Sequence, residues 1–367
     1  MESTQPQRLY FIDALRALAI LLMLEGHFID TLLDPIYHDS GTIYNVWKYL
    51  RGMTAPVFFT ISGFIFTYLL LKAAGGTYEK QRLKKGLKRG LLLIFIGYLL
   101  RTPFLSWLFG DFDSRFFRVD VLQCIGLSLI LIIFIFYLCR GRKILFLTLS
   151  LLVWIILFLS EPLYRELTLD RIPLIISNYL TKAHGSVFTI VPWFGYVTFG
   201  ASLSSIFNLF ENKRYFKWSC ICVMLFLGIY LFRYSSFLFD EIFLYTSWEV
   251  FKSVAWYNYL FPRLADVLLL FAVFFALNQY LNIRIISKLG QKTLSIYVIH
   301  FIILYGSFTG LGLRQLIGKS LDPYQAGFGA ILFTAVVSVI SLAELHTNQF
   351  FYKRWKKLLH SIKSPQP

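Results

Sequence analysis

The chain has 367 residues, of which 57% are hydrophobic and 15% are charged. This composition excludes a soluble domain with an ordinary polar surface, and apolar runs of about 17–25 residues, long enough to cross a bilayer, recur along the sequence. The net charge of +16 does not point to nucleic acid, because the cations lie mainly in short connections that would face anionic lipid headgroups. The sequence therefore predicts an all-α, polytopic integral membrane protein.

The apolar runs predict a single transmembrane domain that covers residues 1–367 and contains about ten helices. We place these helices at residues 10–31, 51–71, 90–109, 120–139, 144–161, 187–208, 217–234, 263–281, 293–310 and 324–344. Lys and Arg are more frequent in every second connection and at both ends of the chain, so we expect both termini in the cytoplasm, with 345–367 as a basic tail. The longer connections 32–50, 162–186 and 235–262 then face outward, and the last predicts an interfacial helix or a re-entrant hairpin.

The first span carries ionisable residues on one side. Arg16 and His27 are eleven residues apart, which is three helical turns plus about 20°, so they share a face about 16 Å apart along the axis. Ionisable groups within a span rarely face lipid, and we therefore expect this stripe to line an interior or a wet cavity. Asp13 can pair with Arg16 at i, i+3, so a buried ion pair that fixes helix packing is the alternative for those two residues.

A basic run, KQRLKKGLKR, precedes the third span and contains Arg82, Lys85, Lys88 and Arg89. At helical spacing Arg82, Lys85 and Arg89 share a face that could bind the phosphates of a ligand. A cationic inner loop is also what topology alone requires, and both interpretations stay open.

Five further polar residues near the ends of later spans are candidates for substrate binding. Arg51, Asp120 and Gln123 lie at predicted outer helix ends, where each could bind a substrate hydroxyl or cap its helix. His184 lies just before the sixth span and either approaches a substrate or belongs only to the loop. His300 either packs in the interior with a hydrogen bond or reaches a cavity.

The opening RLYFIDALRALAILLMLEGH resembles the first helix of the transmembrane acyltransferase superfamily. Its acyltransferase family three members carry a basic residue, ten spacer residues and a histidine, which Arg16 and His27 match. The heparan-α-glucosaminide N-acetyltransferase branch instead has Asn at the His27 position and its essential histidine in the following outer loop, where His38 lies. Four further stretches are similar to helices of the bacterial relatives of that acetyltransferase: LRGMTAPVFFTISGFIFTYLL (50–70), RVDVLQCIGLSLI (118–130), VPWFGYVTFGASL (191–203) and KLGQKTLSIYVIHFIILYG (288–306).

One departure from the pattern concerns the third helix. Acyltransferase family three carries Arg-x-x-Arg there, whereas this chain has Lys85-x-x-Lys88 followed by Arg89. The resemblance is therefore closer to the glucosaminide acetyltransferase branch. It implies transfer of an acetyl group from cytoplasmic acetyl-CoA to an amino or hydroxyl group of an extracytoplasmic glycan, and relatives in the lysosomal branch suggest a homodimer.

The transfer reaction needs a base for the acceptor proton, and histidine suits this role near neutral pH. We expect His38 to transfer the proton while His27 positions the thioester or the acceptor. Asp34 or Asp39 would orient His38, as carboxylates do in catalytic triads, while Glu25 and Asp30 could serve His27 in the same way. Direct transfer is favoured over an acylated histidine.

The donor is expected to dock its phosphates on the basic run and to thread its pantetheine arm along the stripe from Arg16 to His27. We expect no metal, since the four cysteines lie within or beside apolar runs and lack metal-ligand spacing. The lack of a long N-terminal extension favours a bacterial inner membrane. A secondary transporter or flippase for a sugar or lipid-linked substrate is the alternative, although no paired repeat of the transporter kind is found.

Overall fold

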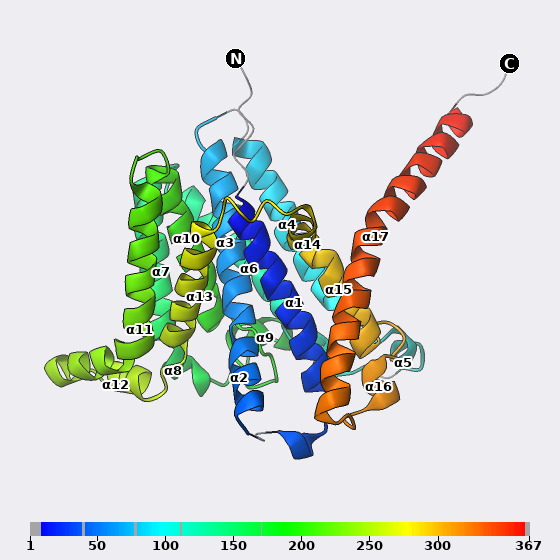
Figure 1. The fold of residues 1–367 in the computed structure, drawn as a ribbon, viewed down its shortest axis with the longest axis horizontal. Helices are drawn as coiled ribbons and strands as arrows, with labels where there is room; N and C mark the ends of the chain where they lie inside the picture. The colour runs from blue at the N-terminus through cyan, green and yellow to red at the C-terminus, as the bar shows by residue number, and fades with distance from the viewer. Residues whose placement is uncertain (1–8, 39–40, 77–78, 111, 170, 364–367) are drawn as a thin grey trace.

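The computed structural model describes residues 9–38, 41–76, 79–110, 112–169 and 171–363 as a bundle of helices (Figure 1). Its long helices are α1 (Tyr10–Leu32), α3 (Thr54–Ala73), α4 (Glu79–Leu100), α6 (Val121–Leu138), α7 (Lys143–Leu159), α10 (Ile190–Phe210), α11 (Phe216–Thr246), α13 (Leu260–Ala276), α15 (Thr293–Tyr305) and α17 (Pro323–Lys363). The all-α prediction is confirmed, because the described residues form no strand and only one isolated bridge, between Leu33 and Leu321.

Shorter helices gather mainly at one end of the bundle, where α1 ends (Figure 1). They are α2 (Gly41–Gly52), α5 (Phe104–Leu108), α8 (Glu161–Arg165), α9 (Leu174–Leu180), α12 (Glu249–Trp256) and α16 (Leu313–Ile317), with the 3₁₀ turns η1 (Pro35–Tyr37) and η2 (Ser114–Phe117). At the opposite end lies α14 (Arg284–Gln291), close to where α1 begins (Figure 1). The segments that the sequence assigns to opposite sides of a membrane thus separate to opposite ends of the fold.

Several helices can cross a bilayer, so the protein is a multi-pass membrane protein. By length and composition five helical segments qualify: Gly41–Ala73, Ser114–Leu138, Ile190–Phe210, Phe216–Thr246 and Pro323–Ala343. A sixth is the pair α12 and α13, which are bent by 61° relative to each other. Helices also lie at the other four predicted spans, but α7 and α15 have only 17 and 13 residues, α1 carries four charged residues and α4 begins with the basic run. The count of ten spans stays a prediction.

The helices differ most from the predicted spans at three places. Helix α4 starts at Glu79, because the basic run consists largely of good helix formers, and it ends at Leu100 because Pro103 disfavours helical geometry in the residue before it. Helix α11 continues to Thr246, well beyond the predicted end of its span, and α12 leaves the bundle sideways (Figure 1). Helix α17 extends without a break through most of the predicted tail.

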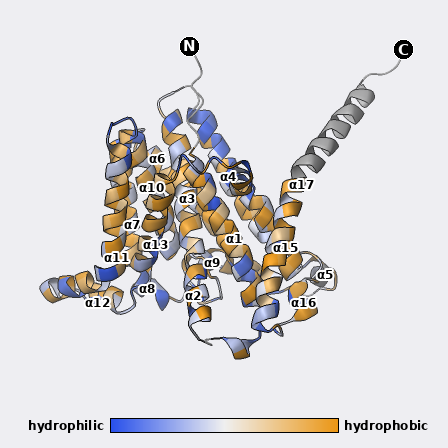
Figure 2. Cartoon of the chain, in the orientation of Figure 1, coloured by the Kyte–Doolittle hydropathy of each residue, from blue (hydrophilic) through white to orange (hydrophobic). Residues whose placement is uncertain are grey.

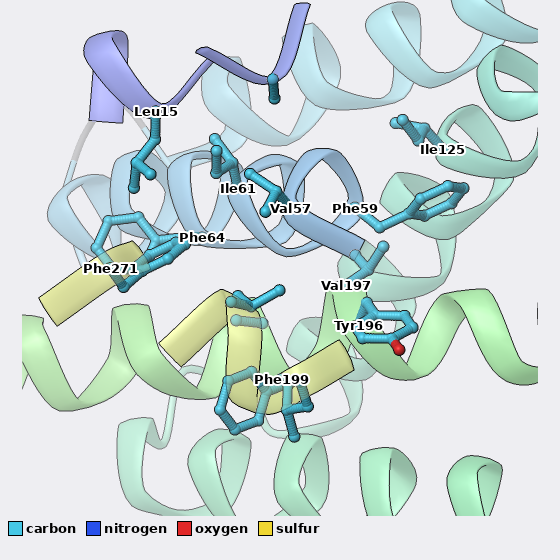
Figure 3. Close-up of a cluster of buried hydrophobic side chains, with 14 of the residues drawn as sticks. Leu15, Val57, Phe59, Ile61, Phe64, Ile125, Tyr196, Val197, Phe199 and Phe271 are labelled. Atoms are coloured by element: carbon cyan, nitrogen blue, oxygen red, sulfur yellow. The ribbon is translucent and has the colours of Figure 1, made fainter. Parts of the chain in front are cut away.

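The centre of the bundle is built around α3, whose side chains interlock with those of α1, α6, α10 and α13 (Figure 3). Glycines bring α3 and α10 into close contact. A Cβ on Gly63 would lie 2.0 Å from the carbonyl oxygen of Val197, and one on Gly200 would lie 2.0 Å from that of Thr60. Such small-residue contacts are typical of helix pairs in membranes. Hydrophobic residues cover the outer faces of the helices, and hydrophilic residues gather towards their ends (Figure 2).

Candidate functional site

A cavity of about 380 Å³ lies between α1, α3, α4, α6 and α15. This volume falls within the range of small-molecule sites, roughly 300–1,000 Å³. Its walls are mainly apolar, with side chains such as Ile20, Ile65, Leu93 and Ile125. Polar and cationic side chains lie towards its two ends. The cavity can therefore hold an elongated ligand whose polar groups are at its ends.

Arg16 and His27 both line this cavity, as their helical spacing predicts. They are about 16 Å apart along α1, given the rise of 1.5 Å per residue. Helix α15 runs alongside, since its first residue, Thr293, contacts Arg16 and its last, Tyr305, contacts His27. The cavity thus extends along α1 from Arg16, near the start of the helix, to His27, near its end.

The Arg16 end of the cavity is cationic. The guanidinium Nη2 of Arg16 donates a hydrogen bond of 2.8 Å to Thr293 Oγ1, and Arg16 interacts electrostatically with Arg89 of α4, which lines the same cavity, and with Asp13. Two arginines that share one cavity repel each other unless an anion lies between them. This end is therefore suited to a phosphate group.

The other members of the basic run lie differently. Arg82 is close enough to Arg89 to interact with its charge, although it does not line the cavity. Lys85 and Lys88 are exposed on the surface of α4, and neither is among the described lining residues. The structure therefore brings Arg16 and Arg89 together at the cavity and leaves the two lysines outside it.

Helix α15 contacts the ring of His27 through Tyr305. Its Nδ1 lies 2.7 Å from the hydroxyl of Tyr305, which also accepts a hydrogen bond of 3.3 Å from Thr31 Oγ1. With Nδ1 engaged, Nε2 is the ring nitrogen available to a ligand in the cavity. If Nδ1 carries the proton and donates it to Tyr305, Nε2 has a free lone pair and can act as a base.

The carboxylates near His27 are bound by α2. Arg51 Nη2 forms an ion pair of 2.9 Å with Asp30, and Trp47 Nε1 donates a hydrogen bond of 2.5 Å to Glu25. Gly26 permits this packing, because a Cβ there would lie 2.9 Å from Cγ of Arg51. Arg51 also lines the cavity, which places its cation at the His27 end. Glu25 and Asp30 are thus engaged with α2 rather than with the imidazole.

His38 and its neighbours lie outside the cavity among the described residues. His38 follows η1, and its ring stacks on Tyr44 of α2 with centroids 5.7 Å apart. Asp34 caps η1 by accepting a hydrogen bond of 2.9 Å from the amide of Ile36. Asp39, the other predicted carboxylate, lies outside the described residues. The sequence offers no periodic signal for these positions, because they belong to a connection rather than to a helix.

Asp120 and Gln123 form the cap of α6. The Asp120 amide donates to Gln123 Oε1 at 3.2 Å, and the Asp120 carboxylate pairs with Arg101 at 2.8 Å. The structure thus shows the cap, and binding of a substrate hydroxyl by these residues stays a prediction. The Asp120 charge still reaches His27 electrostatically, so this carboxylate belongs to the surroundings of the histidine even though neither Asp120 nor Gln123 lines the cavity.

The two remaining histidine candidates also lie outside the described cavity lining. His184 is half-buried in the connection before α10, and its Nε2 has no partner among the described residues. His300 is fully buried on α15. Its ring is in edge contact with that of His27, and the two ring centroids are 5.3 Å apart. Thr293 and Tyr305 were not singled out from the sequence, because nothing in a pattern links them to residues about 277 positions away.

A family model described as "Heparan-alpha-glucosaminide N-acetyltransferase, catalytic" matches residues 8–236, which is well over half of the chain. The matched segment begins just before α1 and ends within α11, so it contains Arg16, His27 and Arg89 but not Thr293 or Tyr305 of α15. A search of curated proteins found no match.

Proposed function

Because the chain belongs to the heparan-α-glucosaminide N-acetyltransferase catalytic family, it is a membrane acyltransferase, and we propose that it moves an acetyl group from cytoplasmic acetyl-CoA to an amino or hydroxyl group of an extracytoplasmic glycan. The supporting observation is the single cavity that connects the Arg16 and Arg89 end with His27. Donor and acceptor can then stay on opposite sides of the membrane. In this proposal the protein has ten spans and both termini in the cytoplasm, and it forms a homodimer in a bacterial inner membrane.

The donor enters from the end where α1 begins. Its phosphates bind Arg16 and Arg89, with Arg82 adding to the positive potential. The pantetheine arm lies along the apolar walls, and the thioester reaches His27. The cavity fits such a molecule in three respects: a cationic end, a narrow apolar middle part and a histidine about 16 Å away along α1.

The acceptor enters from the end where α1 finishes. Its amine or hydroxyl attacks the thioester carbonyl, and the carbon–sulfur bond breaks as the new bond forms. Nε2 of His27 takes the acceptor proton, while Nδ1 carries a proton and donates it to the Tyr305 hydroxyl, which lies 2.7 Å away. The proton then passes to the departing thiolate of CoA, so His27 returns to its neutral form.

This assignment exchanges the roles that the sequence gives to the two histidines. His27 becomes the base because it lines the cavity, and His38 lies at the approach for the acceptor, stacked on Tyr44. Asp34 and Asp39 would then shape this approach without contacting the base. Arg51, at the same end of the cavity, would contact the acceptor.

The test is acetyl transfer by the purified protein in detergent, with acetyl-CoA and an amino sugar or a hydroxyl sugar. We expect acetylated product from the wild type, and none from His27→Ala, which should still bind CoA. Thr148→Ala, an exposed position on α7, serves as the control. Accumulation of an unmodified sugar in sealed vesicles, without acetylation, would instead support the transporter alternative.

A further inference from the structure

His300 is buried in a way that its packing does not explain. Its side chain is 0% exposed, and neither ring nitrogen makes a well-formed hydrogen bond within the described part of the chain. The backbone carbonyls of Ile296 and Tyr297, which are already used within the helix, lie near the ring. A buried polar group without a partner costs about 1–3 kcal/mol. An apolar residue would fill this position at lower cost, so the imidazole is expected to have a partner in another state of the protein.

His27 is a neighbouring group that can serve as this hydrogen-bond partner. The two ring centroids are 5.3 Å apart, with an angle of 61° between the ring planes. A ring nitrogen lies about 1.1 Å from its centroid, and an N–H···N bond spans about 2.9–3.0 Å, so two hydrogen-bonded imidazoles have centroids about 5.2 Å apart. The backbones are therefore already at the correct separation, and a turn of the rings alone can join them.

His27 thus has two alternative partners on α15. In this structure its Nδ1 contacts the hydroxyl of Tyr305. After a turn of the ring, an N–H of His27 can point to a nitrogen of His300. Tyr297 and Phe301 pack against His300 with centroids 4.9 and 5.5 Å away, which holds the second imidazole in place to receive it.

We propose that His300 is a positioning residue for acetyl transfer, which accepts the N–H of His27 when that ring turns away from Tyr305. The inference rests on the proposed function. During turnover His27 must take a proton from the acceptor and deliver it to the departing sulfur, and these two atoms lie at different points. Two alternative partners let the same ring occupy two orientations. The acceptor proton ends on the CoA thiol, so the His27–His300 pair gains no proton over a cycle.

Other ionisable groups act on this pair, and each would contribute to a pH profile. Asp120 at the cap of α6, Arg51 on α2 and Asp30 on α1 act on His27 directly. Tyr297 and Tyr305 of α15 contact the pair, and Arg101 after α4 and Arg314 on α16 act on these two tyrosines. His300 is an imidazole in edge contact with His27, so its removal has a signature different from that of removing a charged group.

The experiment compares His300→Phe, which keeps a ring, with His300→Asn, which keeps a hydrogen-bond acceptor. We expect His300→Phe to lower kcat by tenfold or more, within the roughly 100- to 10,000-fold that acid–base groups contribute, with KM for acetyl-CoA unchanged. The acidic limb of its kcat profile should move to lower pH, because the imidazolium of His27 loses a partner. His300→Asn should recover much of kcat. Ile302→Phe, which places the same ring at a half-exposed position of α15, is the matched control.

The proposal would be overturned if a folded, CoA-binding His300→Phe protein kept the wild-type kcat and pH profile. It would also be overturned if His300→Phe and His300→Asn lost kcat equally and neither shifted the pH profile. A wild type that forms no acetylated product would refute the proposed function instead. If neither variant folds, ¹⁵N-histidine labelling of the wild type decides. A coupling between ring nitrogens that disappears in His27→Ala supports the pair, and its absence refutes it.

Discussion

The hydroxyl of Tyr305 lies 2.7 Å from Nδ1 of His27, although 278 positions separate them in the chain. This contact engages Nδ1 and leaves Nε2 as the ring nitrogen available to a ligand; when Nδ1 carries the proton and donates it to the hydroxyl, Nε2 has a free lone pair. The helix that supplies Tyr305 also supplies Thr293 to Arg16, so α15 contacts both Arg16 and His27, which line the cavity from α1.

Removal of the Tyr305 hydroxyl should therefore affect catalysis more than donor binding. We expect Tyr305→Phe to lower kcat by about tenfold, a part of what an acid–base group supplies, with KM for acetyl-CoA within about twofold of the wild type. Thr31→Val, which removes only the weaker bond to the same hydroxyl, is the matched control and should lower kcat less. Steady-state kinetics with both substrates measure these effects. Equal kcat in Tyr305→Phe and the wild type would show that the tautomer is set in another way.

The two histidines of the N-terminal region can be separated by a second comparison. We expect His27→Ala to reduce transfer by roughly 100- to 10,000-fold while CoA still binds, because Arg16 and Arg89 remain at the other end of the cavity. His38→Ala should raise KM for the acceptor and leave most of kcat, because His38 stacks on Tyr44 outside the described lining. Complete loss of transfer in His38→Ala, with activity kept in His27→Ala, would restore the assignment made from the sequence.

Helical periodicity is the part of the candidate site that the sequence predicts well. The period of 3.6 residues places Arg16 and His27 on one face, and both line one cavity. Local patterns fail where function depends on contacts between distant segments. Thr293 and Tyr305 carry no signal of their partners, and His38 lies in a connection whose course no periodicity determines. For the same reason the sequence could place the basic run near a helix but could not separate Arg89, which lines the cavity, from Lys85, which does not.

The arginines at the other end of the cavity predict a change in donor affinity. We expect Arg89→Ala to raise KM for acetyl-CoA by about tenfold or more, since a charge-assisted hydrogen bond contributes about 1.5–3 kcal/mol, and to lower kcat little. Arg214→Ala is the control and should keep the wild-type KM, because Arg214 is exposed in the connection between α10 and α11 and does not line the cavity. Titration with CoA and with 3′-dephospho-CoA shows which phosphate is bound. A wild-type KM in Arg89→Ala would exclude this end of the cavity as the phosphate site.

The glycine contacts between α3 and α10 predict which small substitution the bundle cannot accept. A Cβ on Gly200 would lie 2.0 Å from the carbonyl oxygen of Thr60, so Gly200→Ala must push α10 away from α3. Overpacking of this kind typically costs about 1–3 kcal/mol, and it also displaces Ile61 and Ser62, which line the cavity.

We therefore expect Gly200→Ala to lower both the Tm in detergent and the affinity for CoA. Gly327→Ala makes the same chemical change on α17, where a Cβ meets no atom within 4 Å, and its Tm should equal or slightly exceed that of the wild type, because alanine favours a helix over glycine. Thermal unfolding and CoA titration of the two variants test the prediction together. Equal Tm values for the two variants would mean that α3 and α10 can separate without loss of stability, and the close helix contact would then not be what holds this wall of the cavity.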